Sequence, residues 1–350
     1  NINIIGTVAM QQGLAPNEVG TTTFRAPYTP VSFGAIGGLR EDSVVLPYRH
    51  TPITHWNLNN GAFMYESGAR WRRPGYFPQD GESFQDTVNR ECRTVRNGVG
   101  VYDGSPLGTF ELKGRDVGKF LDHVYTNIMS NLKPGRARYG LMLREDGIAM
   151  DDGTAARLAE DHFVVTTTTA NALPVYRHME FVRQCLFPDL DVQLISTTEA
   201  WAQYAVAGPN ARNLLEKIVD TDISNDAFPF MACANITVCG GLRARLFRIS
   251  FSGELAFEIA VPTAYGDALM RRIMDAGAEY DVTAYGTESL GVMRIEKGHA
   301  AGNELNGTTS ALNLGMGRMV SKAKDSIGSK LSEREGLNTP DALAQVGIKP

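Results

Sequence analysis

Two adjacent carboxylates, Asp151 and Asp152, lie in a segment, residues 148–158, whose sequence predicts a β-strand. Neighbouring residues of a strand point to opposite faces, so one carboxylate is expected to face water and the other the interior. An inward carboxylate flanked by Met150 and Ala155 is costly unless it is used for binding or proton transfer. The alternative, that both aspartates sit in a strand bulge or at an exposed edge, stays open from the residues alone.

A second candidate is Glu254, which follows a Ser-Gly turn in the run RISFSGELAFE, residues 248–258. A carboxylate on a turn can accept paired hydrogen bonds from the guanidine-like edge of a heterocycle. A solvated hairpin turn is the alternative. A third candidate is Arg294, near the end of a helix predicted over residues 285–297, where cations are favourable and an ordinary salt-bridged helix end is the default.

A small basic cluster, Lys133, Arg136 and Arg138, precedes a predicted β-meander. Such a cluster can meet an anionic tail, and a solvated turn is the alternative. The sequence contains no dinucleotide fingerprint, P-loop, G-x-S-x-G elbow or H-E-x-x-H motif. Its six histidines show no metal spacing and its four cysteines form no C-x-x-C pair. No metal site and no disulfide scaffold are therefore expected, and the cysteine usage is typical of the reducing cytoplasm.

The composition excludes several classes of protein. The net charge of −5 offers no strongly basic field for nucleic acid or an anionic membrane surface. No apolar run approaches the roughly 18 residues that a membrane span needs. Of the 350 residues, 43% are hydrophobic, which is enough for a sizeable core. The length suggests about two or three domains.

Repeated strand–glycine–helix units are expected to position these candidates. The two best-matched units are residues 110–113, Gly114 and 117–124, and residues 204–207, Gly208 and 211–219. Their glycines are 94 residues apart, which indicates duplicated halves rather than a solenoid with repeats of about 20–50 residues. A third unit covers residues 256–276, and a capped helix is predicted over Phe84–Asn97. A meander of strands lies between the units, at residues 138–143, 148–158 and 163–168.

Strands that run together, with helices set apart, favour an α+β fold over a doubly wound parallel sheet. Residues 1–80 are rich in Gly, Pro and Thr. Residues 1–50 are expected to form an extended arm or linker, because each proline removes a donor and biases its predecessor to extended geometry. A domain is expected to begin near Thr51. The last residues, 344–350, read like the start of a strand, so we expect a piece of a longer polypeptide.

Five segments together resemble the folate-dependent aminomethyltransferase family, the glycine-cleavage T-protein and its relatives. They are YDGSPLG (102–108), residues 139–152, VAGP (206–209), SFSGE (250–254) and RIEKG (294–298), within a likeness that covers residues 51–331. A closer likeness is to the carboxy-terminal half of the alpha subunit of heterotetrameric sarcosine oxidase. It is carried by GTTTFRAPYTPV (20–31), RRPGYFP (72–78) and FPFM (228–231).

The resemblance implies an α+β aminomethyltransferase-like fold that binds tetrahydrofolate in a central hole between domains. It makes residues 1–50 an arm from a preceding flavoprotein half and residues 51–350 the folate-binding domain, with subdomains at about 51–200 and 201–331. Residues 332–350 would begin a truncated C-terminal barrel. The site residues implied are Asp152 as the catalytic carboxylate, Glu254 at the pterin edge, Arg294 near the glutamyl moiety, and Tyr139, Leu107 and Thr154 around the folate.

The implied function is capture of the methylene unit of oxidised sarcosine as 5,10-methylene-tetrahydrofolate. FAD, FMN and NAD are then expected only on the rest of a complex with beta, gamma and delta subunits. Two departures stand out, because the T-protein's Gly-Tyr-Thr-Gly-Glu is here SFSGE and the family's carboxy-terminal barrel is missing. Two alternatives are a non-catalytic folate-fold interaction module and a stand-alone aminomethyltransferase or demethylase. The retained polar residues favour transfer over a scaffold, and the linker-like start argues against a stand-alone enzyme.

Overall fold

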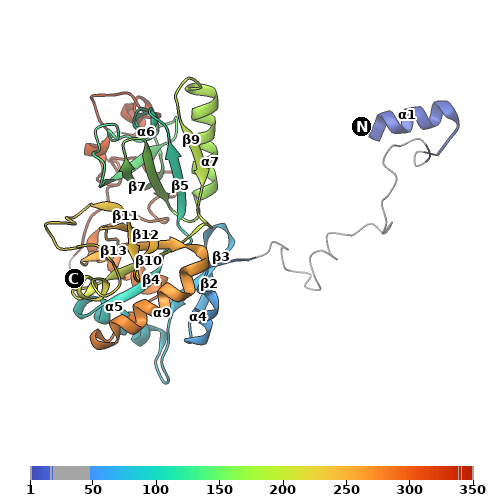
Figure 1. Cartoon of the computed structure of the whole chain (residues 1–350). Coiled ribbons are helices and arrows are strands. Elements are labelled where there is room, and N and C mark those ends of the chain that lie inside the picture. The colour runs from blue at the N-terminus through green and yellow to red at the C-terminus, as the bar shows by residue number, and fades with distance from the viewer. Residues whose placement is uncertain (1, 16–17, 19–47, 338, 340, 349–350) are drawn as a thin grey trace. The chain divides into compact units, whose positions relative to one another are not determined.

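The computed structural model describes residues 2–15, 18, 48–337, 339 and 341–348. The chain divides into two compact units, Asn1–Pro47 and Tyr48–Pro350. The first unit contains helix α1 (Ile2–Gln12), in place of the start of the expected extended arm (Figure 1). This stretch contains no proline, so nothing in it breaks the helical hydrogen bonds. The proline-bearing residues 21–30 that suggest an extended arm lie outside the described residues.

The second unit contains three sheets, most of whose strands pair antiparallel. In sheet order, the three-stranded sheet is β1 (Arg49–His50), β3 (Trp71–Tyr76) and β2 (Phe63–Glu66). The five-stranded sheet is β6 (Arg136–Leu143), β7 (Ala149–Ala159), β8 (His162–Thr167), β5 (Gly108–Lys113) and β9 (Gln193–Ser196). The six-stranded sheet is β11 (Cys233–Val238), β12 (Leu242–Phe247), β13 (Ala256–Pro262), β10 (Trp201–Ala207), β4 (Gly100–Asp103) and β14 (Thr283–Ala284).

Helices cover the outer faces of the two larger sheets. The α-helices of this unit are α4 (Thr54–Asn59), α5 (Phe84–Asn97), α6 (Val117–Val124), α7 (Ala172–Phe181), α8 (Ala211–Leu215), α9 (Gly266–Gly277) and α10 (Thr287–Lys297). Short helical turns are Gly68–Arg70, Val182–Leu186, Thr263–Tyr265, Ala278–Tyr280, Gly317–Met319, Leu331–Glu333 and Glu335–Leu337. The predicted α+β class is confirmed.

The two larger sheets are duplicated halves, as the glycine spacing predicted. Strand β5 leads through Gly114 into α6, and β10 leads through Gly208 into α8. The two glycines share an unusual backbone angle, with φ of 135° and 130°. A Cβ would lie 2.0 Å from Asp191 O at Gly114 and 2.4 Å from Gly98 O at Gly208. Only glycine fits such a turn, because the backbone approaches too closely for any side chain.

Each half also receives one strand from the other half. Strand β4 directly precedes β5 in the chain but pairs with β10, while β9 precedes β10 but pairs with β5. Both pairings are antiparallel. The boundary between the two halves is therefore interwoven.

Gly208→Ala is expected to lower the free energy of unfolding by about 3 kcal/mol or more, because the strained backbone and the overlap with Gly98 O add together. The matched control is Gly241→Ala, since Gly241 has a φ of 128° but nothing within 4 Å of its Cβ position. The control is expected to cost about 1–2 kcal/mol, from backbone strain alone. Chemical denaturation measures both, and equal losses would show that the close approach is unimportant.

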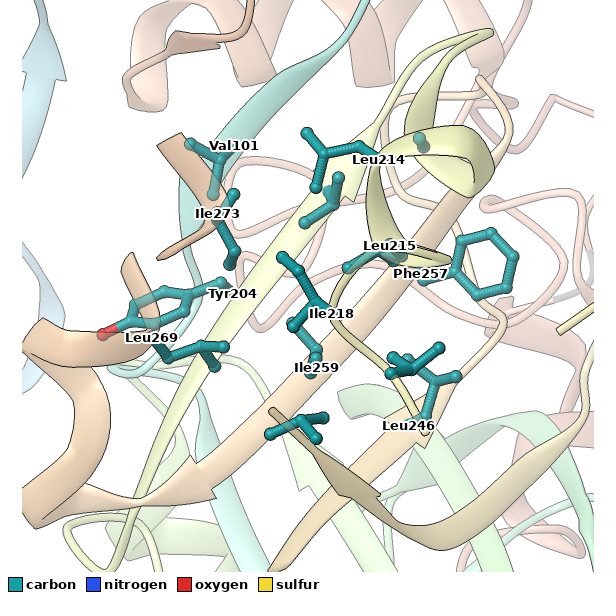
Figure 2. Close-up of a cluster of buried hydrophobic side chains, with 14 of the residues drawn as sticks. Val101, Tyr204, Leu214, Leu215, Ile218, Leu246, Phe257, Ile259, Leu269 and Ile273 are labelled. Carbon is teal, nitrogen blue, oxygen red and sulfur yellow. The ribbon is translucent and has the colours of Figure 1, made fainter. Parts of the chain in front are cut away.

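Two cores lie under the helices. Phe110, Phe120, Phe163 and their neighbours pack between the five-stranded sheet and α6 and α7. The six-stranded sheet packs against α8 and α9 through the larger core shown in Figure 2. On their other faces the two sheets meet through a smaller cluster: Ala137, Ala156, Val164, Cys233, Phe247 and Ile249.

Three local predictions concern helix α5, helix α8 and the last residues of the chain. Helix α5 forms over the predicted residues, and the Ser83 and Asp86 side chains form a capping box at its start. Helix α8 ends at Leu215, before the predicted residue 219, and continues as irregular turns. The strand expected from residue 344 does not form among the described residues. Residues 341–348 adopt neither helix nor strand.

Candidate functional site

Asp152 lies on β7, which is paired on both sides, with β6 and β8. The register places Tyr139 of β6 on the same face as Asp152, which is 8% exposed. Tyr139 Oη donates a hydrogen bond to Asp152 Oδ2 at 2.5 Å and lies 3.8 Å from Met316 Sδ. The carboxylate therefore has one fixed hydrogen-bond donor and a thioether nearby.

Asp151 faces the opposite side of the sheet and is fully buried. Its carboxylate accepts hydrogen bonds from the backbone N–H and Oγ1 of Thr168 and from Nδ2 of Asn171. The expectation that one of the two aspartates faces water is wrong, because both faces of this sheet are covered. A register irregularity lies next to Asp151, opposite Met142 and Leu143, but it exposes neither carboxylate.

Burial, helped by the nearby Asp151, raises the pKa of Asp152 to about 6, although the hydrogen bond from Tyr139 opposes the rise. Burial and Asp152 also raise the pKa of Tyr139, which stays a hydrogen-bond donor at neutral pH. A carboxyl group that titrates near pH 6 can both release and take up a proton under physiological conditions.

Thr154 continues the polar strip along the same face of β7. Its Oγ1 lies 2.8 Å from Thr166 Oγ1 on β8, and its backbone N–H donates to the same oxygen. Between Asp152 and Thr154, a Cβ on Gly153 would lie 1.9 Å from Thr166 O. The glycine lets β8 approach closely, which fixes the position of both neighbouring side chains.

Glu254 lies in the loop between β12 and β13 and forms an ion pair there. Arg96 Nη1, from α5, donates to Glu254 Oε1 at 2.7 Å and to Ser252 O at 2.9 Å. Arg96 Nη2 also donates to Glu296 Oε2 at 2.5 Å, so this loop is tied to α10. Phe251 stacks on His299 with ring centroids 5.4 Å apart. Glu254 is thus part of a half-buried network rather than a solvated turn.

Arg294 lies in the last turn of α10, close to that network, and is 7% exposed. Its Nη1 donates to His299 O at 3.0 Å and to Glu304 Oε2 at 2.8 Å. The salt-bridged helix end that was the default expectation forms. A contact of Arg294 with a ligand stays a prediction.

Leu107 lies in the turn between β4 and β5 and is half-buried. In the described part of the chain, no hydrogen bond or ion pair joins Asp152 to Glu254 or Arg294. The structure therefore brings Asp152 and Tyr139 together directly, and it brings Glu254 next to the helix that carries Arg294. Residues 299–320 connect the two groups, because Glu304 O accepts from Thr309 and Thr309 O accepts from Ala149 of β7.

Sequence reasoning missed several members of this region. Arg96 and Met316 lie far along the chain from the residues that they contact, so no spacing signal marks them. Tyr125 has a buried hydroxyl without a hydrogen-bond partner among the described residues, and its ring packs where Gly140 has no side chain. Burial raises the pKa of Glu258 to about 7, and its carboxylate accepts a hydrogen bond from Gln203. The alternation of β13 puts this carboxylate on the face opposite Phe257 and Ile259, so no sequence signal marks it as buried.

The described residues lack two kinds of feature. They contain no group of three or more His, Cys, Asp or Glu side chains that is able to hold a metal ion. None of their helices combines the length and the apolar character that crossing a membrane requires.

Comparisons with known proteins agree with the geometry. Residues 53–324 match the family model described as the GCVT N-terminal domain, and residues 1–39 match the sarcosine oxidase A3 domain. The chain is 49% identical to the sarcosine oxidase subunit alpha of Rhizobium meliloti, over all of this chain and 36% of that protein. It is 32% identical to an aminomethyltransferase of Geobacillus sp., over 82% of this chain and 75% of the relative.

The fold has a counterpart among solved structures. The glycine cleavage system aminomethyltransferase T from Bartonella henselae superimposes with a TM-score of 0.71 at 23% identity. That match covers 82% of this chain and 74% of the other, and it supports the fold alone. Taken with the family model, these likenesses show that the chain belongs to the aminomethyltransferase family of the glycine-cleavage T-protein, represented by the GCVT N-terminal domain.

Proposed function

We propose that this chain is the tetrahydrofolate-dependent one-carbon transfer module of a sarcosine oxidase-like complex. It would capture the methylene unit of oxidised sarcosine as 5,10-methylene-tetrahydrofolate. One observation carries the proposal, the contrast between the two adjacent aspartates. Asp151 accepts three hydrogen bonds from protein groups, whereas Asp152 accepts a single side-chain hydrogen bond among the described residues, from Tyr139.

A buried carboxylate with so few partners is costly and is most useful when a ligand completes it. Asp152 fits a folate ligand because one of its carboxylate oxygens is left for the ligand. Among the described residues, no side chain donates a hydrogen bond to that second oxygen. An N–H of an amine ligand would complete that carboxylate. Glu254 uses only Oε1 for Arg96, so its Oε2 can accept a hydrogen bond from a heterocycle.

When bound, tetrahydrofolate supplies two amine nitrogens that take up the methylene carbon, while both amine protons pass to the released glycine. Asp152, ionised above pH 6, stabilises the positive charge that develops on the attacking amine and accepts its proton. Tyr139 holds the carboxylate in place through its 2.5 Å hydrogen bond. Because the closed face of the sheet excludes water, this electrostatic effect is stronger than it would be in solvent.

The chain spans 36% of the length of the sarcosine oxidase alpha subunits that it matches. The oxidation of sarcosine, with FAD, FMN and NAD, is therefore proposed for other parts of the complex, which would include beta, gamma and delta subunits. None of the four cysteines forms a disulfide, which is consistent with a proposed location in the reducing cytoplasm.

One observation favours a second candidate, a non-catalytic interaction module. Both Glu254 and Arg294 are already ion-paired, with Arg96 and Glu304. A folate-like fold kept only for assembly would have such internally satisfied pairs. It would not need the incompletely satisfied Asp152, which is why transfer is the preferred proposal.

Calorimetric titration with 5-formyl-tetrahydrofolate, a stable reduced folate, separates these candidates. Saturable binding is expected, weakened about 10-fold or more by Glu254→Ala, which removes a charged acceptor. Asp152→Asn is expected to keep most of the affinity. The control is Lys113→Gln, which neutralises an exposed cation of β5 and should bind like the unaltered chain. A folded chain that shows no binding would favour the interaction module.

A further inference from the structure

The side chain of Met316 lies beside the candidate site and takes no part in the proposed transfer chemistry. Tyr139 Oη donates to Asp152 Oδ2 at 2.5 Å and also lies 3.8 Å from Met316 Sδ. No other methionine sulfur among the described residues accepts a hydrogen bond. Because a thioether is a weak acceptor and a carboxylate is a strong one, the phenol proton belongs to Asp152 while the sulfur is unmodified.

Met316 is held in place and is still open to solvent. Its backbone N–H donates to Ala311 O at 2.8 Å, and its side chain packs against the small apolar cluster that contains Leu314. The residue is half-buried, and the glycines on either side of it are exposed. A Cβ on Gly315 would meet nothing within 4 Å, so a small solute can approach the chain there.

Hydrogen peroxide oxidises a thioether by transfer of one oxygen atom. The sulfur lone pair attacks the peroxide, an S–O bond forms, the O–O bond breaks and water leaves. The sulfur loses the electron pair that the peroxide gains, so the step needs no other reactant. The amine oxidation proposed for other parts of the complex is a source of peroxide when its electrons pass to O₂.

Oxidation would change the acceptor that Tyr139 prefers. A sulfoxide is polar, and its oxygen accepts hydrogen bonds that a thioether accepts only weakly. An oxygen on the side of the sulfur that faces Tyr139 reaches beyond the sulfur along a contact of 3.8 Å, so it comes within hydrogen-bond distance of Oη. A phenol has a single proton to donate, so a hydrogen bond made to the sulfoxide is lost to Asp152.

We propose that Met316 is a peroxide-sensitive modification site, whose sulfoxide takes the hydrogen bond of Tyr139 away from Asp152. The titratable groups that interact with Asp152 are Tyr139 on β6, Asp151 on its own strand and Tyr125 after α6. The hydrogen bond from Tyr139 lowers the pKa of Asp152, so oxidation should raise that pKa. The effect on transfer rests on the proposed function, whereas the effect on Asp152 does not.

Titration of the Asp152 carboxyl by carbon NMR, before and after mild treatment of the full chain with hydrogen peroxide, tests this. Peptide mass analysis should find one added oxygen on Met316. The pKa of Asp152 should rise by about one unit, the order expected when a charge-assisted hydrogen bond is lost. Reduction by methionine sulfoxide reductases should restore the original value. Met316→Leu keeps the apolar volume and should show no rise after peroxide.

Two further variants separate the hydrogen bond from other effects of oxidation. Met319→Leu is the matched control, because Met319 is also half-buried and packs against the same apolar cluster. Its sulfur accepts no hydrogen bond from the described residues, so this variant should respond to peroxide like the unaltered chain. Tyr139→Phe removes the proton that the sulfoxide would take, so oxidation should no longer move the pKa of Asp152.

In the assembled complex, the oxidised chain should capture the methylene unit about fivefold more slowly at about pH 6 and at nearly the normal rate at about pH 8, because the higher pKa leaves less Asp152 ionised near pH 6. A pKa that stays constant while Met316 is oxidised, or a rise that persists in Met316→Leu, would overturn the inference and leave the proposed function standing. An untreated complex that captures no methylene unit would overturn the proposed function, and the NMR titration would still decide the inference.

Discussion

Asp152→Asn is expected to slow capture of the methylene unit by about 100-fold or more, the usual effect of losing a positioned acid–base group. Asparagine keeps the shape and can still accept the hydrogen bond from Tyr139, but it neither stabilises positive charge nor accepts a proton. The measurement is the rate of 5,10-methylene-tetrahydrofolate formation in the assembled complex that contains this chain. A rate near that of the unaltered complex would contradict the assignment of Asp152.

The pH profile of the same reaction gives a second readout. The rate is expected to rise with pH through about 6, where Asp152 ionises. Tyr139→Phe removes the hydrogen bond that lowers the pKa of Asp152, so this rising limb should move to higher pH. A purely structural role for Tyr139 would lower the rate without moving the limb.

Stability measurements serve as the control for the Asp152 variant. Folding raises the pKa of Asp152 from 3.8 to about 6, so the folded state binds this proton more tightly than the unfolded state. The stability linked to that proton is present below about pH 4 and is lost as pH rises through about 6, by up to about 3 kcal/mol. Asp152→Asn should therefore unfold at a higher denaturant concentration than the unaltered chain at about pH 8, and that advantage should disappear near pH 4.

Much of this fold is visible in the sequence because its strongest signals are local. Gly114 and Gly208 mark equivalent turns, and the structure gives them nearly equal φ angles. The capping box at Ser83 and the left-handed Gly298 mark the ends of two helices. In each case the requirement is met within a few residues, so a single sequence carries it.

The features that the sequence did not reveal depend on long-range contacts. The exchange of β4 and β9 between the halves leaves no local trace, because each strand pairs with residues far away in the chain. Arg96 and Glu254 are 158 residues apart, and only the fold makes them partners. Residue type and strand alternation made Asp152 a candidate. Its burial could not be predicted in the same way, because it depends on distant segments that cover both faces of the sheet.

The opposite error occurred at Glu91, which belongs to the buried face of α5. The spacing of Val88, Cys92 and Val95 predicts one apolar helix face, yet Cys92 is half-buried and Glu91 is fully buried. A carboxylate at i+3 from Val88 and i−4 from Val95 lies on the face that these residues share. The spacing was sufficient to place it inward, but residue type argued for the surface.

Glu91→Ala is expected to lower the free energy of unfolding by about 3–5 kcal/mol, because it leaves buried donors without an acceptor. Glu91 Oε1 accepts from Phe77 N–H at 2.7 Å, and Oε2 accepts from Gly286 N–H at 3.0 Å and Ser289 Oγ at 2.6 Å. One carboxylate thus joins α5 to the segment after β3 and to the start of α10. Burial raises its pKa, and the three donors oppose that rise.

Chemical denaturation at about pH 7 measures this loss, with Arg93→Ala as the matched control on the exposed face of the same helix. The control is expected to change the free energy of unfolding by less than about 0.5 kcal/mol. Glu91→Gln keeps the size but turns an amide N–H₂ toward one of the donors, so an intermediate loss is expected. If Glu91→Ala costs no more than Arg93→Ala, the carboxylate does not hold α10 in place. A large loss would instead show that the helix carrying Arg294 depends on a buried carboxylate of α5.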